Sequence, residues 1–254
     1  MGVPGYVSAR VRRPIPEGLH VLAGSTPVIA FGDCFTSTVA TLGINPSRQE
    51  FTSANGDWLR GAKRRLATAE SVGVASFVDA TDEQVEQVVN DCVRYFERNP
   101  YRRWFDQLDR VLQETTGTSY YEGSACHLDL VQWATDPVWG QIRDRAVREA
   151  LLEADRDFLR TQLAAEQIQT VLINGNAVMH VVADALDVRF ERQAEATAGD
   201  LSSGIYLAER DNTTFVAWSK NFQSSRPMTR GLKDAIAGCV AEALDGVEAG
   251  TPAS

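Results

Sequence analysis

Short apolar segments alternate with longer amphipathic segments along most of the chain, and this alternation constrains the fold more than any other feature. We expect strands at residues 37–44, 123–133, 170–174, 204–207 and 213–218. We expect the main helices at residues 82–98, 104–112, 141–163, 177–186 and 229–244. Because parallel strands need a helical crossover between them, the pattern predicts an α/β fold with a central, mostly parallel sheet of four to five strands flanked by helices.

The chain of 254 residues is long enough for one hydrophobic core, and we expect a single domain over residues 25–246. Residues 1–24 hold several prolines and glycines, which predict an irregular segment, and residues 247–254 predict a disordered tail. No apolar run approaches the roughly 18 residues of a membrane span, and the N-terminus lacks the pattern of a signal peptide. We therefore expect a cytoplasmic protein that is not bound to a membrane.

The four cysteines are scattered, and no two of them form a Cys-x-x-Cys pair. They are Cys34, Cys92, Cys126 and Cys239. Zinc and iron–sulfur sites need closely spaced thiolates, so the spacing indicates reduced, mostly buried thiols and no metal centre.

The net charge of −9 argues against a protein that coats nucleic acid without regard to sequence, because such binding depends on neutralising phosphates. Three basic clusters can still form a local positive face, although a solvated helix surface has the same composition. The clusters are Arg60, Lys63, Arg64 and Arg65; Arg94, Arg98, Arg102 and Arg103; and Arg226, Arg230 and Lys233.

The segment Gly43-Ile44-Asn45-Pro46-Ser47 places a polar side chain directly after a predicted strand. A residue before proline is biased to an extended backbone, which holds the Asn45 side chain outward at the carboxyl end of that strand. Ligands of parallel sheets gather at this end of the strands. The segment is therefore a candidate catalytic loop, although an ordinary turn has the same pattern.

This segment resembles the first motif of the uracil-DNA glycosylase superfamily, and it is most similar to the mismatch-specific and single-strand-selective branches. The resemblance implies an enzyme that flips one base out of DNA and hydrolyses its bond to the sugar, with Asn45 positioning the attacking water. Segments at 123–135, 170–177 and 216–232 follow in the family's order. The resemblance thus covers most of the chain.

The later segments imply further site residues. The resemblance places Asp129 where the family has an Asn that reads the edge of uracil. His127 precedes it by two residues, so in a strand both side chains lie on the same face. The family's last motif often holds a His that is missing here, and Asn221 is the residue offered in its place, with Lys220 as a second donor.

The same resemblance assigns the remaining contacts. Ile44 and Phe51 are candidates to contact the flipped base, although Phe51 also fits an ordinary core position. The candidates for binding DNA are Ser47, Arg48, Lys220, Ser224, Ser225, Arg226 and Arg230. We expect DNA as the partner, no cofactor and no metal, and a monomeric protein.

Asp129 bears on which base is removed. An amide both accepts from N3–H and donates to O4 of uracil, whereas an ionised carboxylate only accepts. A carboxylate suits the exocyclic amine of cytosine, and because removal of normal cytosine would be lethal, we hypothesise a modified cytosine as substrate. Glucosylated hydroxymethylcytosine of bacteriophage DNA is an example, and the enzyme would then act in phage defence. An Asp129 that caps a loop or pairs with an Arg is the structural alternative.

Three other functions stay open on the sequence. The chain could be a uracil or mismatch repair glycosylase, a non-catalytic nucleic-acid-binding module on the same fold, or an enzyme acting on free nucleosides. The sequence contains neither Gly-x-Gly-x-x-Gly nor Gly-x-x-x-x-Gly-Lys-Ser/Thr nor Gly-x-Ser-x-Gly. Dinucleotide, P-loop and α/β-hydrolase chemistry are therefore disfavoured.

Overall fold

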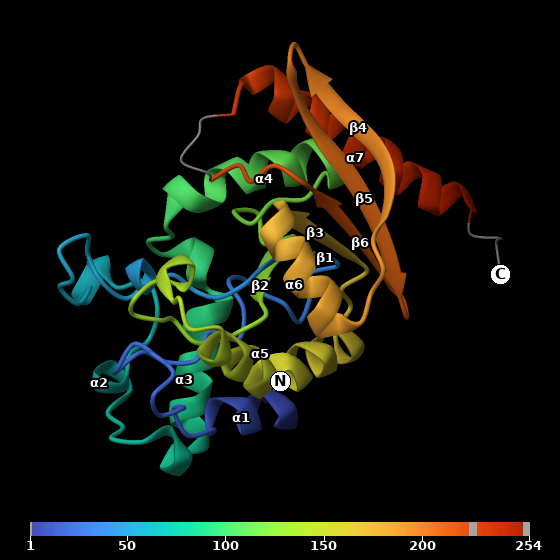
Figure 1. Cartoon of the computed structure of the whole chain (residues 1–254). Coiled ribbons are helices and arrows are strands. Elements are labelled where there is room, and N and C mark those ends of the chain that lie inside the picture. Colours follow the sequence, from blue (N-terminus) through green and yellow to red (C-terminus); the bar gives the residue numbers. More distant parts are fainter. Residues whose placement is uncertain (1, 224–227, 251–254) are drawn as a thin grey trace.

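A computed structural model of the chain describes residues 2–223 and 228–250. Its centre is one six-stranded sheet with the order β2-β1-β3-β6-β5-β4 (Figure 1). The strands are β1 (Val39–Gly43), β2 (Ala125–Asp129), β3 (Thr170–Asn174), β4 (Glu191–Ala198), β5 (Leu201–Arg210) and β6 (Thr213–Trp218). Strands β2, β1, β3 and β6 are parallel, and β5 and β4 continue the sheet antiparallel. The expected α/β fold with a mostly parallel central sheet is confirmed.

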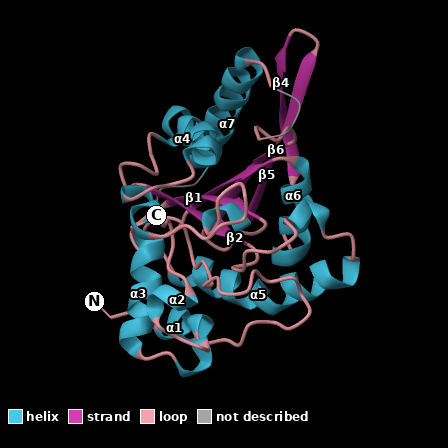
Figure 2. Ribbon diagram, turned by 90° about the vertical axis from the view of Figure 1, so that its left-hand side faces the viewer, coloured by secondary structure: helices cyan, strands magenta, loops and turns pink. Residues whose placement is uncertain are grey.

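Helices cover both faces of this sheet (Figures 1 and 2). They are α1 (Gly5–Val11), α2 (Ala69–Val72), α3 (Asp82–Val93), α4 (Arg102–Thr116), α5 (Arg145–Ala165), α6 (Asn176–Leu186) and α7 (Arg230–Gly250). Helix α7 packs against β4, β5 and β6 and lies beside α4. Helix α6 packs against β3 and β6, and α5 lies beside α6. Because β2, β1, β3 and β6 are parallel, the loops that follow these four strands leave the sheet at the same end.

The N-terminal segment over residues 1–24 was expected to be irregular, but it contains α1, which contacts α3 and α5. Pro4 is the N-cap of this helix, and Pro14 and Pro16 follow its end, so the prolines bound the helix instead of preventing it. At the other terminus α7 continues to Gly250, so the expected tail over residues 247–254 begins as helix. Residues 251–254 lie outside the described part of the chain.

Strand β4 raises the number of strands above the expected four to five. Its sequence, Glu-Arg-Gln-Ala-Glu-Ala-Thr-Ala, has one fully buried side chain, Ala196. The strand occupies the edge of the sheet and pairs with β5 along a hairpin. A strand that buries so little lacks the apolar alternation from which strands are recognised in sequence.

Helix α3 begins at the cap that the sequence predicts. Thr81 Oγ1 accepts from the backbone N–H of Gln84 at 3.3 Å, and Gln84 Oε1 accepts from the backbone N–H of Thr81 at 2.9 Å. This reciprocal pair is a capping box, which satisfies two N–H groups that the first helical turn leaves unpaired. Val85, Val88 and Cys92 lie on the buried face of the helix, as their spacing indicates.

Replacing Thr81 by Ala should lower the free energy of unfolding by about 1 kcal/mol, because one N–H of the first turn loses its acceptor. Thr81→Ser keeps the hydroxyl and should remain close to the wild type. Urea denaturation followed by circular dichroism measures both variants. Equal stability of the Ala and Ser variants would contradict a stabilising role of the cap.

Candidate active site

The loops that follow β1 and β2 meet at the carboxyl edge of the sheet. Gly43 at the end of β1 is in register with Asp129 at the end of β2. A cavity of about 60 Å³ lies beside them. It is lined by Phe31, Asn45, Pro46, Ser47, Glu50, Trp104, Phe105, His127 and Asp129. The two sequence segments that carry the predicted chemistry are thus brought to one cavity.

Asn45 lines this cavity with an amide whose orientation is fixed. Its Nδ2 donates to the backbone oxygen of Trp133 at 3.1 Å and to Oγ1 of Thr135 at 3.2 Å. A backbone carbonyl can only accept, so the amide nitrogen has to face Trp133 and the amide oxygen has to point away from it. Oδ1 is therefore positioned to accept a hydrogen bond from a water or a ligand.

Asp129 and His127 extend from the same face of β2, as their spacing predicts. Asp129 is 4% exposed, and its Oδ1 lies 3.4 Å from Nε2 of His127. Within the described ranges this carboxylate lies next to His127 and pairs with no Arg, and its Oδ2 is buried with no hydrogen-bond donor. A buried polar oxygen without a donor is costly, so a ligand that donates to Oδ2 would be stabilised there.

Gly43 makes room for both of these side chains. A Cβ built at this position would lie 2.5 Å from Oδ1 of Asp129 and 3.0 Å from Nε2 of His127. The Gly of the motif is thus required by the close approach of the neighbouring strand's side chains. A residue with a side chain here would displace the Asp–His pair.

His127 is held from its other ring nitrogen. Nδ1 lies 2.6 Å from Oγ1 of Thr41, which in turn lies 2.5 Å from the hydroxyl of Tyr120. The ring also packs edge to face against Trp104 and Phe105 at the start of α4, with centroids 4.9 and 5.6 Å away. These contacts leave Nε2 facing Asp129.

Glu50 is a second carboxyl at the cavity, and the sequence reasoning missed it. Its side chain is buried, and Oε2 accepts a hydrogen bond from the Tyr95 hydroxyl at 2.5 Å. Burial raises the pKa of Glu50 to about 7, against the opposing effects of the Tyr95 hydrogen bond and the charge of Arg65, and the charge of Asp129 adds to the rise. The available signal was its position five residues after Asn45 in the same loop, but a single Glu among polar residues resembles solvated surface.

A buried ion pair between α1 and α5 holds Gln132, which precedes Trp133 in the loop after β2. Nη2 of Arg10 lies 2.8 Å from Oδ2 of Asp155, and both side chains are buried. The same Asp155 oxygen accepts from the backbone N–H of Gln132 at 2.9 Å, and Arg10 Nε donates to Gln132 Oε1 at 3.2 Å. Gln132 Nε2 donates to the backbone oxygen of Asp129 at 2.7 Å. Helices α1 and α5 thereby hold Gln132 and, through its side chain, the backbone of Asp129.

Two of the expected DNA contacts, Ser47 and Arg48, lie in the loop that follows β1. Ser47 lines the cavity, and its hydroxyl caps the 3-10 helix Arg48–Glu50 by accepting from the backbone N–H of Gln49 at 3.2 Å. Arg48 lies near the surface, where Nη1 is 2.9 Å from Oδ1 of Asp136. Ser47 therefore lies at the cavity, whereas Arg48 does not line it and is restrained by a carboxylate.

The two expected base contacts of this loop do not line the cavity. Phe51 is 1% exposed and packs edge to face against Trp58, with ring centroids 6.3 Å apart. The 3-10 helix before it turns the ring into the core, so the expectation that Phe51 stacks on a base is corrected. Ile44 is partly exposed, and its carbonyl accepts from the backbone N–H of Val131 at 2.8 Å. This backbone hydrogen bond joins the loop after β1 to the loop after β2.

The structure does not bring Asn221 to the cavity, which corrects its expected catalytic placement. Its Oδ1 accepts from the backbone N–H of Gln223 at 2.7 Å and from Nδ2 of Asn174 at 3.3 Å, so its amide holds the turn after β6. This turn still reaches the wall of the cavity, because Nε2 of Gln223 donates to the backbone oxygen of Trp104 at 3.2 Å.

Of the DNA contacts expected from the last motif, the structure describes two. The side chain of Lys220 is exposed, next to Asn221. Arg230 is exposed at the start of α7, with Nε 3.9 Å from Oδ2 of Asp234. Ser224, Ser225 and Arg226 lie outside the described residues.

Two of the predicted basic clusters come together next to the cavity. Arg64 and Arg98 both form ion pairs with Asp91, at 3.2 and 2.5 Å. Nη1 of Arg65 donates to the backbone oxygen of Gln49, the residue before Glu50, at 2.6 Å. The Asp91 carboxylate thus pairs with two guanidinium groups here, while Arg60, Arg94 and Arg102 of the same clusters pair with Glu70, Glu97 and Asp106.

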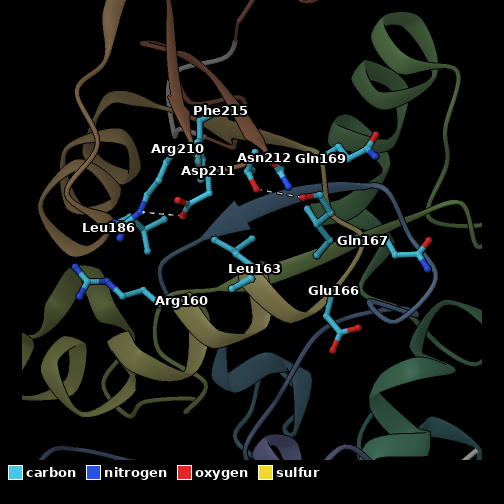
Figure 3. A pocket seen from close by; sticks show the side chains of 13 residues that line it. Arg160, Leu163, Glu166, Gln167, Gln169, Leu186, Arg210, Asp211, Asn212 and Phe215 are labelled. Carbon is cyan, nitrogen blue, oxygen red and sulfur yellow. Dashed lines mark hydrogen bonds and ion pairs between the residues drawn. The ribbon is translucent and has the colours of Figure 1, made fainter. Parts of the chain in front are cut away.

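A larger cavity, of about 450 Å³, opens at the opposite edge of the sheet (Figure 3). Arg160 and Arg210 line it together with Glu166 and Asp211, so its charges balance, and Nε of Arg210 lies 3.5 Å from Oδ2 of Asp211. Parallel sheets bind ligands at the carboxyl ends of their strands, and a charge-balanced pocket does not favour a polyanion. The candidate site for the predicted chemistry is therefore the smaller cavity at Asn45.

Within residues 2–223 and 228–250, no group of His, Cys, Asp and Glu side chains is arranged to hold a metal ion. Cys34, Cys92 and Cys126 are buried thiols, as the sequence predicts, and Cys239 is half-buried. None of the helices in the same ranges combines the length and the apolar character that crossing a bilayer requires.

No protein-family model matches the chain, and a search of curated proteins gives no match. The function therefore has to be argued from the cavity at the carboxyl edge and from the chemistry of the residues around it.

The raised pKa of Glu50 predicts a stability that depends on pH. A carboxyl whose pKa rises from 4.5 to about 7 on folding stabilises the folded state fully below about pH 4.5, and this stabilisation is lost as the pH rises through about 7. At about 1.4 kcal/mol per pKa unit, the wild type should lose about 3 kcal/mol relative to Glu50→Gln between about pH 4.5 and 8.

Denaturant unfolding of both proteins across this pH range measures the difference. Glu122→Gln, at an exposed position in the turn before β2, is the matched control and should follow the wild type. If the stability difference between the wild type and Glu50→Gln did not change with pH, the pKa of Glu50 would be the same in the folded and unfolded states, which would contradict the prediction.

Proposed function

We propose that this protein is a DNA glycosylase, a hydrolase that flips one base out of DNA and cleaves its bond to deoxyribose to leave an abasic site. The observation that carries the proposal is the placement of Asn45 at the carboxyl edge of the sheet, with its amide nitrogen bound to Trp133 and Thr135 and its oxygen free to hold a water. In this proposal the protein acts on DNA as a monomer in the cytoplasm, without a metal or cofactor.

Hydrolysis of an N-glycosidic bond needs an oriented water and stabilisation of charge on the leaving base. Asn45 Oδ1 would accept one hydrogen of the water and leave its lone pair directed at C1′ of the sugar. An amide is a weak base, so Asn45 would act by positioning and not by removing the proton. The guanidinium groups of Arg64, Arg65 and Arg98, two of which also pair with Asp91, would hold the phosphates next to the flipped nucleotide.

A cavity of about 60 Å³ has room for a few water molecules and not for a pyrimidine. Binding of a flipped base therefore requires a side chain at the cavity to move. Trp104 is half-buried, and its backbone is tied to Gln223 of the turn after β6. We infer that displacement of the Trp104 ring by a base opens the site and couples binding to this turn.

Asp129 supports a cytosine derivative as the base. Its buried Oδ2 lacks a donor among the described residues, and the exocyclic amine of cytosine supplies one, whereas O4 of uracil would be repelled. The modification itself has to be recognised, since unmodified cytosine must be spared. Glucosylated hydroxymethylcytosine of phage DNA is our first candidate, which would make the protein a phage-defence enzyme.

A uracil or mismatch repair glycosylase is the second candidate. The observation that favours it is His127, whose Nε2 lies next to Asp129 and can donate to a carbonyl oxygen such as O4. Asp129 would then accept from N3–H of uracil. The two candidates differ in the base that is released.

Asn45→Ala should lower the single-turnover rate of base release by about 100-fold or more, because the water loses its position, while affinity for the same DNA stays unchanged. Oligonucleotides containing glucosylated hydroxymethylcytosine, hydroxymethylcytosine, cytosine or uracil are the probes, with mass detection of the freed base. Asn55→Ala, in an exposed loop, is the matched control. Binding by a wild type that releases no base from any probe would favour a non-catalytic DNA-binding module.

Asp129→Asn should shift release from the cytosine derivative toward uracil, because an amide donates to O4 and loses one acceptor for the exocyclic amine. A change of about 1–3 kcal/mol per mismatched hydrogen bond corresponds to a preference altered by about 5- to 150-fold. Asp200→Asn, exposed in the turn between β4 and β5, controls for the loss of charge. If the ratio of the two released bases did not change, Asp129 would not determine which base is recognised.

A further inference from the structure

We propose that Glu50 is the catalytic acid of this site and delivers a proton to the departing base. The inference rests on the proposed glycosylase activity and adds a residue that no motif indicates. Glu50 lines the same cavity as Asn45 and Asp129. Asn45 and Glu50 come from the loop after β1, and Asp129 from the end of the neighbouring strand, so the water-holding amide and the two carboxyls enclose one small volume.

The hydrogen bonds of Tyr95 determine which Glu50 oxygen can carry the proton. The Tyr95 hydroxyl accepts from the backbone N–H of Tyr101 at 2.8 Å and donates to Oε2 of Glu50 at 2.5 Å. Oε2 is thus occupied as an acceptor. A proton on Glu50 therefore resides on Oε1, the oxygen that Tyr95 does not use.

The surroundings of Glu50 keep this proton available near neutral pH. Burial raises the pKa of Glu50 to about 7, and the facing groups are Tyr95 and Arg65, which favour the charged form, and Asp129, which disfavours it. His127 stands next to Asp129 on the same wall of the cavity. An acid is most effective when its pKa lies near the working pH, which is the condition met here.

The chemistry balances with one water and no further reactant. As the bond between C1′ and the base nitrogen breaks, its electron pair passes to the base, and the proton of Glu50 moves to an acceptor atom of the base. The water held by Asn45 adds its oxygen to C1′ and gives up one proton, which returns to the Glu50 carboxylate. The base leaves neutral, the sugar carries a hydroxyl, and the acid is restored. General acid catalysis accelerates the release of cytosine derivatives more than that of uracil, because cytosine is a poorer anionic leaving group than uracil.

The test is the pH dependence of single-turnover base release from the oligonucleotide that the wild type processes. Release by the wild type should decline as the pH rises above about 7, the value to which the pKa of Glu50 is raised. Glu50→Gln keeps the size of the side chain but holds no transferable proton. It should be slower by about 100-fold or more, lose this alkaline decline, and bind the DNA with unchanged affinity.

Tyr95→Phe provides a second measurement that does not depend on the folding of Glu50→Gln. It removes a hydrogen bond that favours the ionised carboxylate, so the pKa of Glu50 should rise and the alkaline decline should move to higher pH. Glu122→Gln should keep both the wild-type rate and the wild-type profile.

Wild-type rate and pH profile in Glu50→Gln, with release still lost in Asn45→Ala, would overturn the role of Glu50 and leave the glycosylase proposal standing. An alkaline decline that stays in place in Tyr95→Phe would also overturn it. A wild type that releases no base from any oligonucleotide would overturn both proposals.

Discussion

The buried ion pair between Arg10 and Asp155 is the contact on which the candidate site depends. Removing two charges from water costs several kcal/mol per ion, and their mutual attraction and hydrogen bonds to neighbouring groups offset this cost. Here the Asp155 carboxylate also receives the backbone N–H of Gln132, and the Arg10 guanidinium lies 4.9 Å above the ring of Trp133. Nη1 of Arg10 is buried without a hydrogen-bond partner among the described residues, so Nη2 and Nε make the polar contacts of this guanidinium, to Asp155 and to Gln132. The Gln132 side chain in turn donates to the backbone oxygen of Asp129.

Each polar group at the cavity is oriented by a second group behind it. Trp133 and Thr135 hold the Asn45 amide, Thr41 holds the His127 ring, and Tyr95 holds the Glu50 carboxyl. The wall between them is aromatic, so the electrostatic interactions inside are less screened than at the surface. Groups that are already oriented need no reorganisation when charge develops on a substrate, which is what a hydrolytic site requires.

The parts of this structure that the sequence predicts are those with a local cause. The apolar runs of β3 and β6 and the cap of α3 are set by neighbouring residues, and the parallel arrangement alone brings Asn45 and Asp129 to one edge. Glu50 was missed because its burial depends on Tyr95, 45 residues away in the chain. Phe51 was misplaced because a single turn of 3-10 helix decides which way its ring points. Polar strand β4 was missed because its partner, and not its own pattern, makes it a strand.

The two outermost strands of the sheet, β2 and β4, bear on whether this chain can self-associate. An uncovered strand offers free N–H and C=O groups to another molecule, which promotes aggregation. On the β2 side the chain protects itself, because Phe31 exchanges both backbone hydrogen bonds with His127 at 2.8 and 2.9 Å.

The β4 side relies on charge and irregularity. Arg192 and Glu195 form an ion pair at 3.0 Å, and the pairing register shifts between Arg192 and Ala194. Alternating charges and a local kink disfavour the flat alignment that a fibril needs. The hairpin therefore extends the sheet without offering a flat, regular strand with which another molecule can pair.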